Sequence, residues 1–560
     1  MLDSILRDVL APPECPGVVP IFVNAGAALL PAIVAGVSSV LGVILKPREL
    51  VRVCRTKPHI PALVVVVGGL IGALIWYLAA GGPPPERDRS ADRPTGPDWE
   101  KVAHQVIAAG GVDAFLAKQE PAEAAEAAKP AQDPKAAAIV APAPAPAKQA
   151  DLFFRMGPDR TGTDGGDAPT GLKEEWSYTE EFTMFLSSPT VQRGRLFAGT
   201  CYLDLGTSYG SVVCLDAKTG REIWMTDVLP GDLDLKGIFS SPAVTADGKS
   251  VLIGQGLHFD RNSQLVCLDA ETGKVRWIIP TPLHLEGSPG IEGDIVAIGA
   301  GAIEKMPSRE LDSHPGFVLA ARISTGETLW KYDVNDPESS PVIADGIVYI
   351  GAGFNGNAIV ALRTETDEDL EAKGLAREIW RAPMKHPITS AVTLVGDVLL
   401  ASGGNGDYIA SDHDAPEGVV VALSRADGKI LWETKHDDAV LGAAAVADGK
   451  VVCGSRTGEV IALALDTGKL LWKQRVSKHM PVLAAPAIAA GRVYAVSNNG
   501  YLAVLNADTG EVLEKHYIND KKRPGEMDLC VSSPTIAGGR LHVGTETGGL
   551  RCYTGKGGER

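Results

Sequence analysis

The chain has 560 residues and a formal net charge of −16; 45% of its residues are hydrophobic and 22% are charged. Such a chain can bury a large core, which excludes wholesale disorder, and its acidic balance argues against a nucleic-acid partner. Eight cysteines in 560 residues are too few for a disulfide scaffold, and the absence of a Cys-x-x-Cys pair excludes a zinc ribbon and a thioredoxin-like redox motif.

Two apolar runs near the N-terminus predict a pair of membrane-spanning helices. Residues 18–45 and 63–80 carry no charged side chain, and a helix that crosses a bilayer needs about 20 apolar residues. We therefore expect a transmembrane hairpin over residues 1–80, with helices at about 18–45 and 61–80 in contact with the lipid bilayer. A cleaved signal peptide is the alternative for the first run, but that run is longer than the apolar region of such a peptide.

The loop between the two runs sets the expected orientation. Residues 46–57 contain five basic side chains and one acid, Glu49. Short basic loops stay in the cytoplasm. The pattern therefore predicts a multi-pass protein of the inner (cytoplasmic) membrane whose C-terminal part lies on the extracytoplasmic side.

Residues 81–150 have the composition of a linker. They include PAEAAEAAKPAQDP and APAPAPAK, which cannot build a core and are typical of a semi-stiff tether. Within this linker, residues 98–118 are compatible with one or two short helices, broken at Gly110–Gly111.

A tryptophan-containing phrase recurs along residues 151–560. LDAKTGREIW ends at Trp224, and VLNADTGEVLEKH is a copy with Glu514 in place of tryptophan. A second phrase, SSPTV at 187–191 and its variants, precedes each copy and is followed by a glycine-containing turn and an alternating strand. Four short antiparallel strands in about 40–50 residues form the blade of a β-propeller. The tryptophans of the set are Trp176, Trp224, Trp277, Trp330, Trp380, Trp432 and Trp472.

Counting the second phrase gives eight units, so the predicted fold is all-β: an eight-bladed β-propeller of four-stranded antiparallel blades. The last unit, from Ser532 to Gly555, has only three strands before the chain ends. The segment 170–178 stands before the first blade and carries its own tryptophan. We therefore expect this segment to be the outermost strand of the last blade, because ring closure removes open sheet edges.

The repeated phrase also carries a resemblance to a known family. The TG-x-x-x-W copies resemble the tryptophan-docking motif of PQQ-like, or quinoprotein-like, eight-bladed propellers, over roughly residues 170–555. LFFRMGPDRTG at 152–162 is similar to the lead-in of bacterial PQQ-like repeat proteins. The resemblance implies one of two functional classes: PQQ-dependent dehydrogenases, or noncatalytic scaffolds such as the propeller lipoprotein of the outer-membrane barrel-assembly machine.

The features that the resemblance implies for an enzyme are absent from the sequence. Many dehydrogenases of this family hold PQQ beside a disulfide between neighbouring cysteines, and bind calcium through residues on long blade insertions. This chain has no Cys-Cys pair and short connections in blades six to eight. We therefore expect a noncatalytic scaffold that binds another envelope protein, with no catalytic residue and no cofactor. The alternative is a dehydrogenase that uses PQQ and calcium to oxidise an alcohol or a sugar.

The recurring tryptophans are interpreted as structural residues that dock one blade on the next. Packing requires the same side chain in every blade, whereas a single cofactor site would need only one. GAGFNG at 351–356 matches a G-x-G-x-x-G dinucleotide motif, but a strand follows it instead of a helix. We interpret it as a hairpin turn.

Three polar residues precede the second phrase at similar spacing. His284, Asp336 and His386 are expected at the mouth of the central channel, as a polar or metal-binding group. Solvated loop residues are the alternative. Long loops at 258–264, 304–316 and 406–418 are expected on the same face, where scaffolds carry partners; simple drift of loop length is the alternative there.

Overall fold

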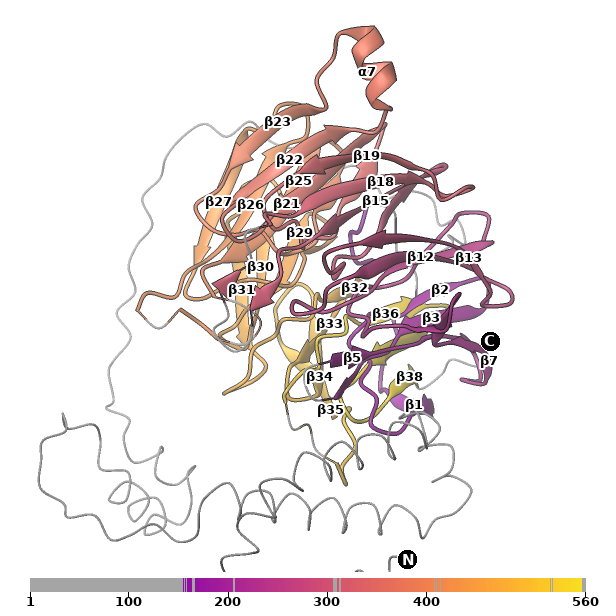
Figure 1. Cartoon of the computed structure of the whole chain (residues 1–560). Helices are drawn as coiled ribbons and strands as arrows, with labels where there is room; N and C mark the ends of the chain where they lie inside the picture. Colours follow the sequence, from indigo (N-terminus) through magenta and orange to yellow (C-terminus); the bar gives the residue numbers. More distant parts are fainter. Residues whose placement is uncertain are drawn as a thin grey trace, which may run out of the picture. The chain divides into compact units, whose positions relative to one another are not determined.

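The computed structural model describes residues 155–555, except residues 156, 158, 164–166, 205–206, 306–309, 312–313, 407, 409, 413, 524 and 526. These residues form eight four-stranded antiparallel sheets, arranged as the blades of a propeller (Figure 1). The predicted all-β, eight-bladed fold is confirmed. In each of the first seven blades the strands follow sequence order from the channel outward.

The strands of blades one to four are β2 (Thr190–Gln192), β3 (Arg195–Gly199), β6 (Val212–Asp216) and β7 (Glu222–Thr226); β10 (Ala243–Val244), β11 (Ser250–Gly254), β12 (Ser263–Asp269) and β13 (Val275–Thr281); β14 (Gly290–Glu292), β15 (Ile295–Ala300), β18 (Phe317–Arg322) and β19 (Thr328–Asp333); and β20 (Val342–Ala344), β21 (Ile347–Ala352), β22 (Ala358–Arg363) and β23 (Glu378–Pro383).

The strands of blades five to eight are β24 (Thr393–Val395), β25 (Val398–Gly404), β26 (Gly418–Ser424) and β27 (Ile430–His436); β28 (Ala445–Ala447), β29 (Lys450–Gly454), β30 (Glu459–Ala464) and β31 (Leu470–Arg475); β32 (Ala487–Ala489), β33 (Arg492–Ser497), β34 (Tyr501–Asn506) and β35 (Val512–Tyr517); and β36 (Thr535–Ala537), β37 (Arg540–Gly544), β38 (Leu550–Thr554) and β1 (Lys173–Tyr178).

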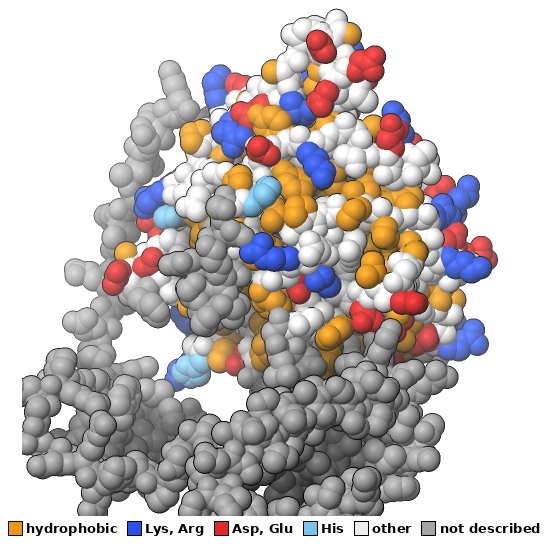
Figure 2. Space-filling view, viewed as in Figure 1, with side chains coloured by type: hydrophobic (Ala, Val, Ile, Leu, Met, Phe, Trp, Pro, Cys, Tyr) orange, Lys and Arg blue, Asp and Glu red, His pale blue; other side chains and the backbone are white. Residues whose placement is uncertain are grey.

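Small insertions lie in blades one, three and four and in the connection between blades one and two. Three two-stranded hairpins join β4 (Tyr202–Asp204) to β5 (Thr207–Tyr209), β8 (Val228–Leu229) to β9 (Leu233–Asp234), and β16 (Glu304–Lys305) to β17 (Glu310–Leu311). Helix α7 (Asp367–Lys373) lies between β22 and β23; the Thr366 side chain caps its first turn, and Gly374 ends it at φ 67°. Acidic side chains gather at this tip (Figure 2).

The structure corrects the predicted localisation. Among the residues that it describes, no helix is long and apolar enough to cross a membrane, and α7 has only seven residues. This finding contradicts the prediction of a multi-pass inner-membrane protein. The predicted hairpin of residues 1–80 with its contact to the lipid bilayer, and the linker of residues 81–150 with its helical segment at 98–118, lie outside the described residues.

The N-terminal strand closes the ring. β1 pairs antiparallel with β38, from Lys173 opposite Thr554 to Tyr178 opposite Leu550. It is the outermost strand of the eighth blade, as the missing outer strand of that unit predicts. At the junction with blade seven, the Glu514 carboxylate accepts hydrogen bonds from the backbone N–H groups of residues 171 and 172. Ring closure therefore joins segments more than 350 residues apart.

The tryptophans dock successive blades on one another. Each indole except that of Trp330 covers a glycine in the turn of the next blade, where a Cβ would fall 2.5–2.7 Å from a ring atom. These glycines have positive φ, so both the turn and the close approach require glycine. The indole N–H groups of six tryptophans donate to backbone carbonyls of the next blade: Trp224 to Ala270, Trp277 to Ile323, Trp330 to Thr364, Trp380 to Arg425, Trp432 to Leu465, and Trp472 to Ala507.

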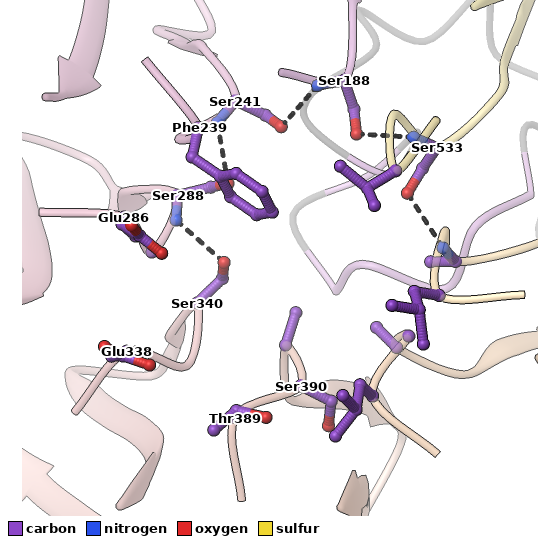
Figure 3. A pocket seen from close by; sticks show the side chains of 18 of the residues that line it. Ser188, Phe239, Ser241, Glu286, Ser288, Glu338, Ser340, Thr389, Ser390 and Ser533 are labelled. Atoms are coloured by element: carbon purple, nitrogen blue, oxygen red, sulfur yellow. Dashed lines mark hydrogen bonds between the residues drawn. The ribbon is translucent and has the colours of Figure 1, made fainter. Parts of the chain in front are cut away.

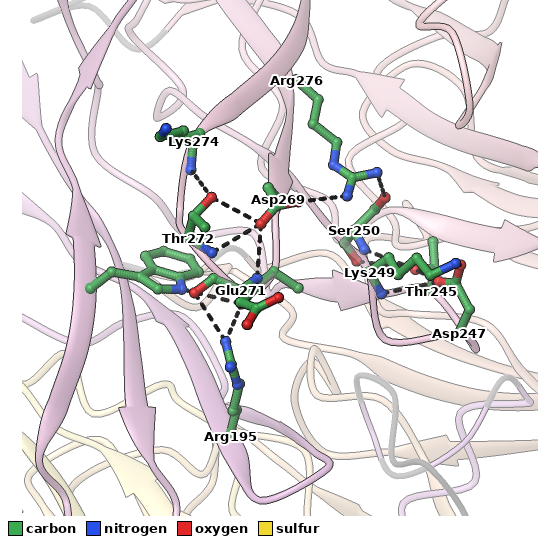
Figure 4. A network of polar contacts seen from close by, with 12 residues as sticks. Arg195, Thr245, Asp247, Lys249, Ser250, Asp269, Glu271, Thr272, Lys274 and Arg276 are labelled. Atoms are coloured by element: carbon green, nitrogen blue, oxygen red, sulfur yellow. Dashed lines mark hydrogen bonds and ion pairs between the residues drawn. The ribbon is translucent and has the colours of Figure 1, made fainter.

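The receiving turn is held by its own side chains (Figure 4). In blade two, the Asp269 carboxylate accepts hydrogen bonds from the backbone N–H and hydroxyl of Thr272, at 3.0 and 2.9 Å. The Arg195 guanidinium, from blade one, donates to the carbonyl of residue 270 at 2.9 Å. The Asp-x-x-Thr-Gly part of the phrase therefore builds the turn, and the tryptophan of the preceding blade packs on it.

Two junctions depart from this pattern. At the junction from blade three to blade four, α7 replaces the Thr-Gly turn, and the Arg377 guanidinium lies over the Trp330 ring, 4.5 Å from its centroid. At the junction from blade eight to blade one, the indole N–H of Trp176 has no hydrogen-bond partner among the described residues. Nε2 of His542 instead contacts the Ala217 carbonyl oxygen at 3.2 Å. At six other junctions the indole N–H of a tryptophan bonds to the matching carbonyl.

His542 is expected to make stability depend on pH. It is 1% exposed, and burial lowers its pKa to about 4; nearby Arg540 lowers it further, while the Ala217 carbonyl and Glu175 oppose the shift. Between pH 6.5 and 4 the unfolded chain binds a proton that the folded chain does not, so stability should fall by about 2 kcal/mol between pH 7 and 4.5.

The measurement is urea unfolding of wild type and His542→Gln at pH 7, 5.5 and 4.5. The variant keeps a hydrogen-bond donor for Ala217 but cannot titrate, so its stability should change less with pH. Some slope will remain, because burial also lowers the pKa of His436 to about 4. Identical slopes for the two proteins would show that His542 is not the titrating group.

Candidate functional site

Two rings of side chains line the central channel. The first consists of the residues two positions before the first strand of each blade, which are serine in blades one to four and eight and alanine in the others: Ser188, Ser241, Ser288, Ser340, Ala391, Ala443, Ala485 and Ser533. Backbone N–H groups donate to the hydroxyl of the next serine, from 188 to 241, 241 to 288, 288 to 340 and 533 to 188, at 2.8–3.0 Å (Figure 3). The second phrase of the repeat therefore builds the channel wall.

The second ring lies two residues earlier and borders the same cavity, which has a volume of about 660 Å³ including space open to solvent. Two neighbouring members, Glu286 and Glu338, are acidic (Figure 3). The other six are five apolar residues and a threonine: Leu186, Phe239, Thr389, Leu441, Leu483 and Val531. The two carboxylates therefore form one polar sector in a largely apolar mouth.

Two buried arginines belong to the segment before β1, and one of them lines this cavity. Arg155 lines it and donates to the carbonyls of residues 160 and 444, and Arg160 donates to those of residues 288 and 289. Burial lowers the pKa of Arg155 to about 10 and that of Arg160 to about 9. Backbone groups of residues 159–162 also bond to the inner strands β24, β28 and β32. The lead-in phrase therefore bonds to blades three, five, six and seven and ties these four blades together.

A polar cluster forms beside the two glutamates. It contains His258 from the β11–β12 loop, His284 and Glu286 from the segment before β14, and Glu338 from the segment before β20. His258 bridges the carboxylates, with Nδ1 2.9 Å from Glu338 and Nε2 3.2 Å from Glu286. Nε2 of His284 is 3.4 Å from Glu338 and 2.9 Å from the Ala302 carbonyl oxygen. We call these four residues the His–Glu cluster.

Burial and charge shift the pKa values of the cluster in opposite directions. Burial raises the pKa of Glu286, with His258 opposing the shift, and burial lowers the pKa of His284. Burial alone would lower the pKa of His258, but the two glutamates outweigh burial and raise this pKa. Burial alone would raise the pKa of Glu338, but His258 outweighs burial and lowers the pKa of this carboxyl. The ionic pair in the cluster is therefore His258 with Glu338.

The structure brings together two of the three predicted channel-mouth residues. His284 and Asp336 are 0% and 1% exposed, and each lies six residues before the first strand of its blade. Asp336 is outside the cluster, because its carboxylate accepts the backbone N–H groups of residues 302 and 354. His386 lies seven residues before β24, one position out of register, and its Nε2 is 3.3 Å from Glu417.

Sequence reasoning missed the other three members of the cluster. Glu286 and Glu338 were visible in principle, because each lies two residues after a predicted residue, in His-Leu-Glu and Asp-Pro-Glu. His258 carries no such signal. It belongs to a long loop, and only the folded chain shows that this loop turns toward the channel.

Comparison with known proteins identifies the family. A family model described as outer membrane protein assembly factor BamB matches residues 208–366 and 370–560, which is more than half of the chain. The chain belongs to this family of PQQ-like propellers. The resemblance seen in the repeated phrase is therefore confirmed.

Curated relatives fall into two groups. BamB of Burkholderia pseudomallei is 25% identical over 47% of this chain and 60% of its own length. The dehydrogenase subunit of the quinone-type alcohol dehydrogenase of Gluconacetobacter polyoxogenes is 29% identical over 36% of this chain and 28% of its own length. The chain thus spans about a quarter to three fifths of the length of these relatives.

Solved structures share the fold. BamB from Moraxella catarrhalis aligns with a TM-score of 0.50 at 18% identity, over 69% of this chain and 98% of that one. Quinohemoprotein alcohol dehydrogenase from Comamonas testosteroni aligns with a TM-score of 0.52 at 16% identity, over 82% of this chain and 85% of that one. At these identities the likeness concerns the fold alone.

Proposed function

We propose that this protein is a noncatalytic scaffold of the cell envelope that binds another envelope protein through the rim of blades five to seven. Family membership supports the proposal, because relatives in the family are named as outer membrane protein assembly factors. The observation that carries it is a run of exposed apolar side chains on three successive outer strands.

The apolar run occupies matching positions in its three blades. In β27, β31 and β35 the two residues before the position of the repeated tryptophan are both apolar and 37–55% exposed. That position holds Trp432, Trp472 and Glu514. In the other five blades at least one residue of the pair is polar or charged, as in Glu174–Glu175 of β1. Exposed large apolar side chains that gather on one side of a protein are typical of protein-binding sites. We call the three pairs the apolar arc: Ile430–Leu431, Leu470–Leu471 and Val512–Leu513.

Site-specific photo-crosslinking in intact cells tests the scaffold. A photoreactive residue at Leu471, in the middle of the apolar arc, is expected to capture one defined envelope protein. The matched position on blade eight, Glu175, should not capture it. Aspartate at Leu431 and Leu513 should reduce the yield from Leu471 by about tenfold, because burying two unpaired charges at an interface is unfavourable. Equal capture from positions 471 and 175 would contradict the proposal.

The dehydrogenase alternative is favoured by the second group of relatives, which includes polyvinylalcohol dehydrogenase of Pseudomonas sp., 24% identical over 56% of this chain. Against this alternative, the mouth ring holds no cationic side chain that would pair with PQQ, a planar tricarboxylate. The charged members of the mouth ring are carboxylates, Glu286 and Glu338, and like charges repel. Phe239 and Tyr408, from blade two and the long loop of blade five, meet edge to face at 5.7 Å beside them.

A titration with PQQ and calcium separates the two functions. We expect no stoichiometric binding by calorimetry and no dye reduction with alcohols or sugars. Tight binding together with substrate-dependent dye reduction would replace the scaffold by an enzyme.

A further inference from the structure

The His–Glu cluster has the composition of a metal site. Two imidazoles and two carboxylates, from three separate loops, place one ligand atom each within 4.8 Å of all the others. Nε2 of His258 lies 3.2 Å from the Glu286 carboxylate, close to the ~3.3 Å between neighbouring ligands of a tetrahedral zinc ion. The four side chains are therefore close enough to converge on a single ion.

We propose that His258, His284, Glu286 and Glu338 bind one divalent transition-metal ion of the zinc class at the channel mouth. Imidazole nitrogen and carboxylate oxygen are both ordinary zinc ligands, and four of them complete a tetrahedral shell. The ion would also neutralise two buried carboxylates that lie side by side. Side-chain exposures of 6% for Glu286 and 8% for Glu338 make that neutralisation favourable.

The surroundings of His284 support the assignment. Its ring is fully buried, and its Nε2–H donates to the Ala302 carbonyl oxygen at 2.9 Å. Metal-binding histidines usually donate their second N–H to a carbonyl or carboxylate in this way. Nδ1 of the same ring is buried and has no hydrogen-bond partner among the described residues, so its lone pair is unused.

Close packing also fixes the position of this imidazole. A Cβ on Gly301 would fall 2.6 Å from the His284 ring, so the glycine lets the β15–β18 connection approach it. Asp336 holds the same connection by accepting the backbone N–H of Ala302 at 2.8 Å. Asp336, identified from the sequence as a candidate site residue, thus acts as a positioning residue for the cluster.

The donor set distinguishes this site from a calcium site. Calcium takes six to eight oxygen ligands, whereas half of the donors here are imidazole nitrogens. We therefore expect the His–Glu cluster to bind zinc or cobalt more tightly than calcium. This preference also separates this proposal from the PQQ and calcium site that the dehydrogenase alternative would need.

Metal titration of the full-length protein, after treatment with a chelator, tests the site. Calorimetry should show one Zn²⁺ bound per chain, Co²⁺ should give the visible absorption of a tetrahedral complex, and Ca²⁺ should bind far more weakly. His258→Ala and Glu286→Gln should each weaken Zn²⁺ binding by more than about tenfold. His258 lies on a loop and is 35% exposed, so its replacement should leave the fold intact, as circular dichroism can check.

His386→Ala is the matched control, because this histidine contacts Glu417 and lies outside the cluster. It should bind Zn²⁺ as wild type does. Absence of saturable Zn²⁺ binding by the wild type, unchanged affinity in both cluster variants, or a preference for Ca²⁺ would each overturn the proposal. Metal binding is measured without any protein partner, so this result and the crosslinking result are independent.

Discussion

A chain that begins at Glu181 should aggregate or melt far below a chain that begins at Asp151. The shorter chain lacks β1, so β38 keeps a bare edge with unpaired backbone groups. It also loses Trp176, which packs on Gly220 of blade one, and the ion pair between Glu175 and Arg540 at 2.7 Å. The eighth blade would then lack the outer strand and the tryptophan that dock it on blade one.

A third chain separates ring closure from the channel segment. A chain that begins at Ala168 keeps β1 but lacks residues 155–163, whose arginines bond to blades three and six. If closure by β1 is decisive, the melting temperature and solubility of this chain should be closer to those of the chain from Asp151 than to those of the chain from Glu181. Scanning calorimetry and size-exclusion chromatography measure both properties. Comparable melting temperatures and solubility for the chains from Asp151 and Glu181 would refute a stabilising role of β1.

The propeller was predictable because its determinants are local and repeated. A turn that ends in glycine and a tryptophan four residues later recur in most blades, and a serine or alanine two positions before the first strand recurs in all eight, at nearly fixed spacing. Each element has one structural role, which the structure shows directly: turn, docking and channel wall. Closure was predictable by counting, because three strands at one end and one strand at the other complete a single blade.

The site was only partly predictable, because loop lengths decide which residues meet there. The blade-five phrase is one residue out of register: β24 begins at Thr393, so Pro387 and not His386 matches the place of His284. His258 reaches the cluster from a loop whose course no periodicity records. α7 replaces a Thr-Gly turn, which explains why the phrase before Trp380 is degenerate. Such departures follow from contacts between blades, which a repeat pattern alone does not encode.

Replacing Trp432 by alanine should lower the free energy of unfolding by about 3–5 kcal/mol, the cost of a large core truncation. Trp432 is 8% exposed, packs over Gly468 of blade six and donates its indole N–H to the Leu465 carbonyl at 2.8 Å. Alanine would leave a cavity between two blades and a buried carbonyl without its donor. Leu471→Ala, at a 48% exposed position, should cost less than about 0.5 kcal/mol by comparison.

Phenylalanine at the same positions separates packing from hydrogen bonding. Trp432→Phe keeps an aromatic ring over Gly468 but removes the N–H donor, so it should cost about 1 kcal/mol more than Trp176→Phe. The indole N–H of Trp176 has no partner, since His542 contacts the Ala217 carbonyl in its place. Urea unfolding of the two variants measures this difference. Equal costs would mean that the tryptophans dock the blades by packing alone, and that the N–H bonds add nothing to stability.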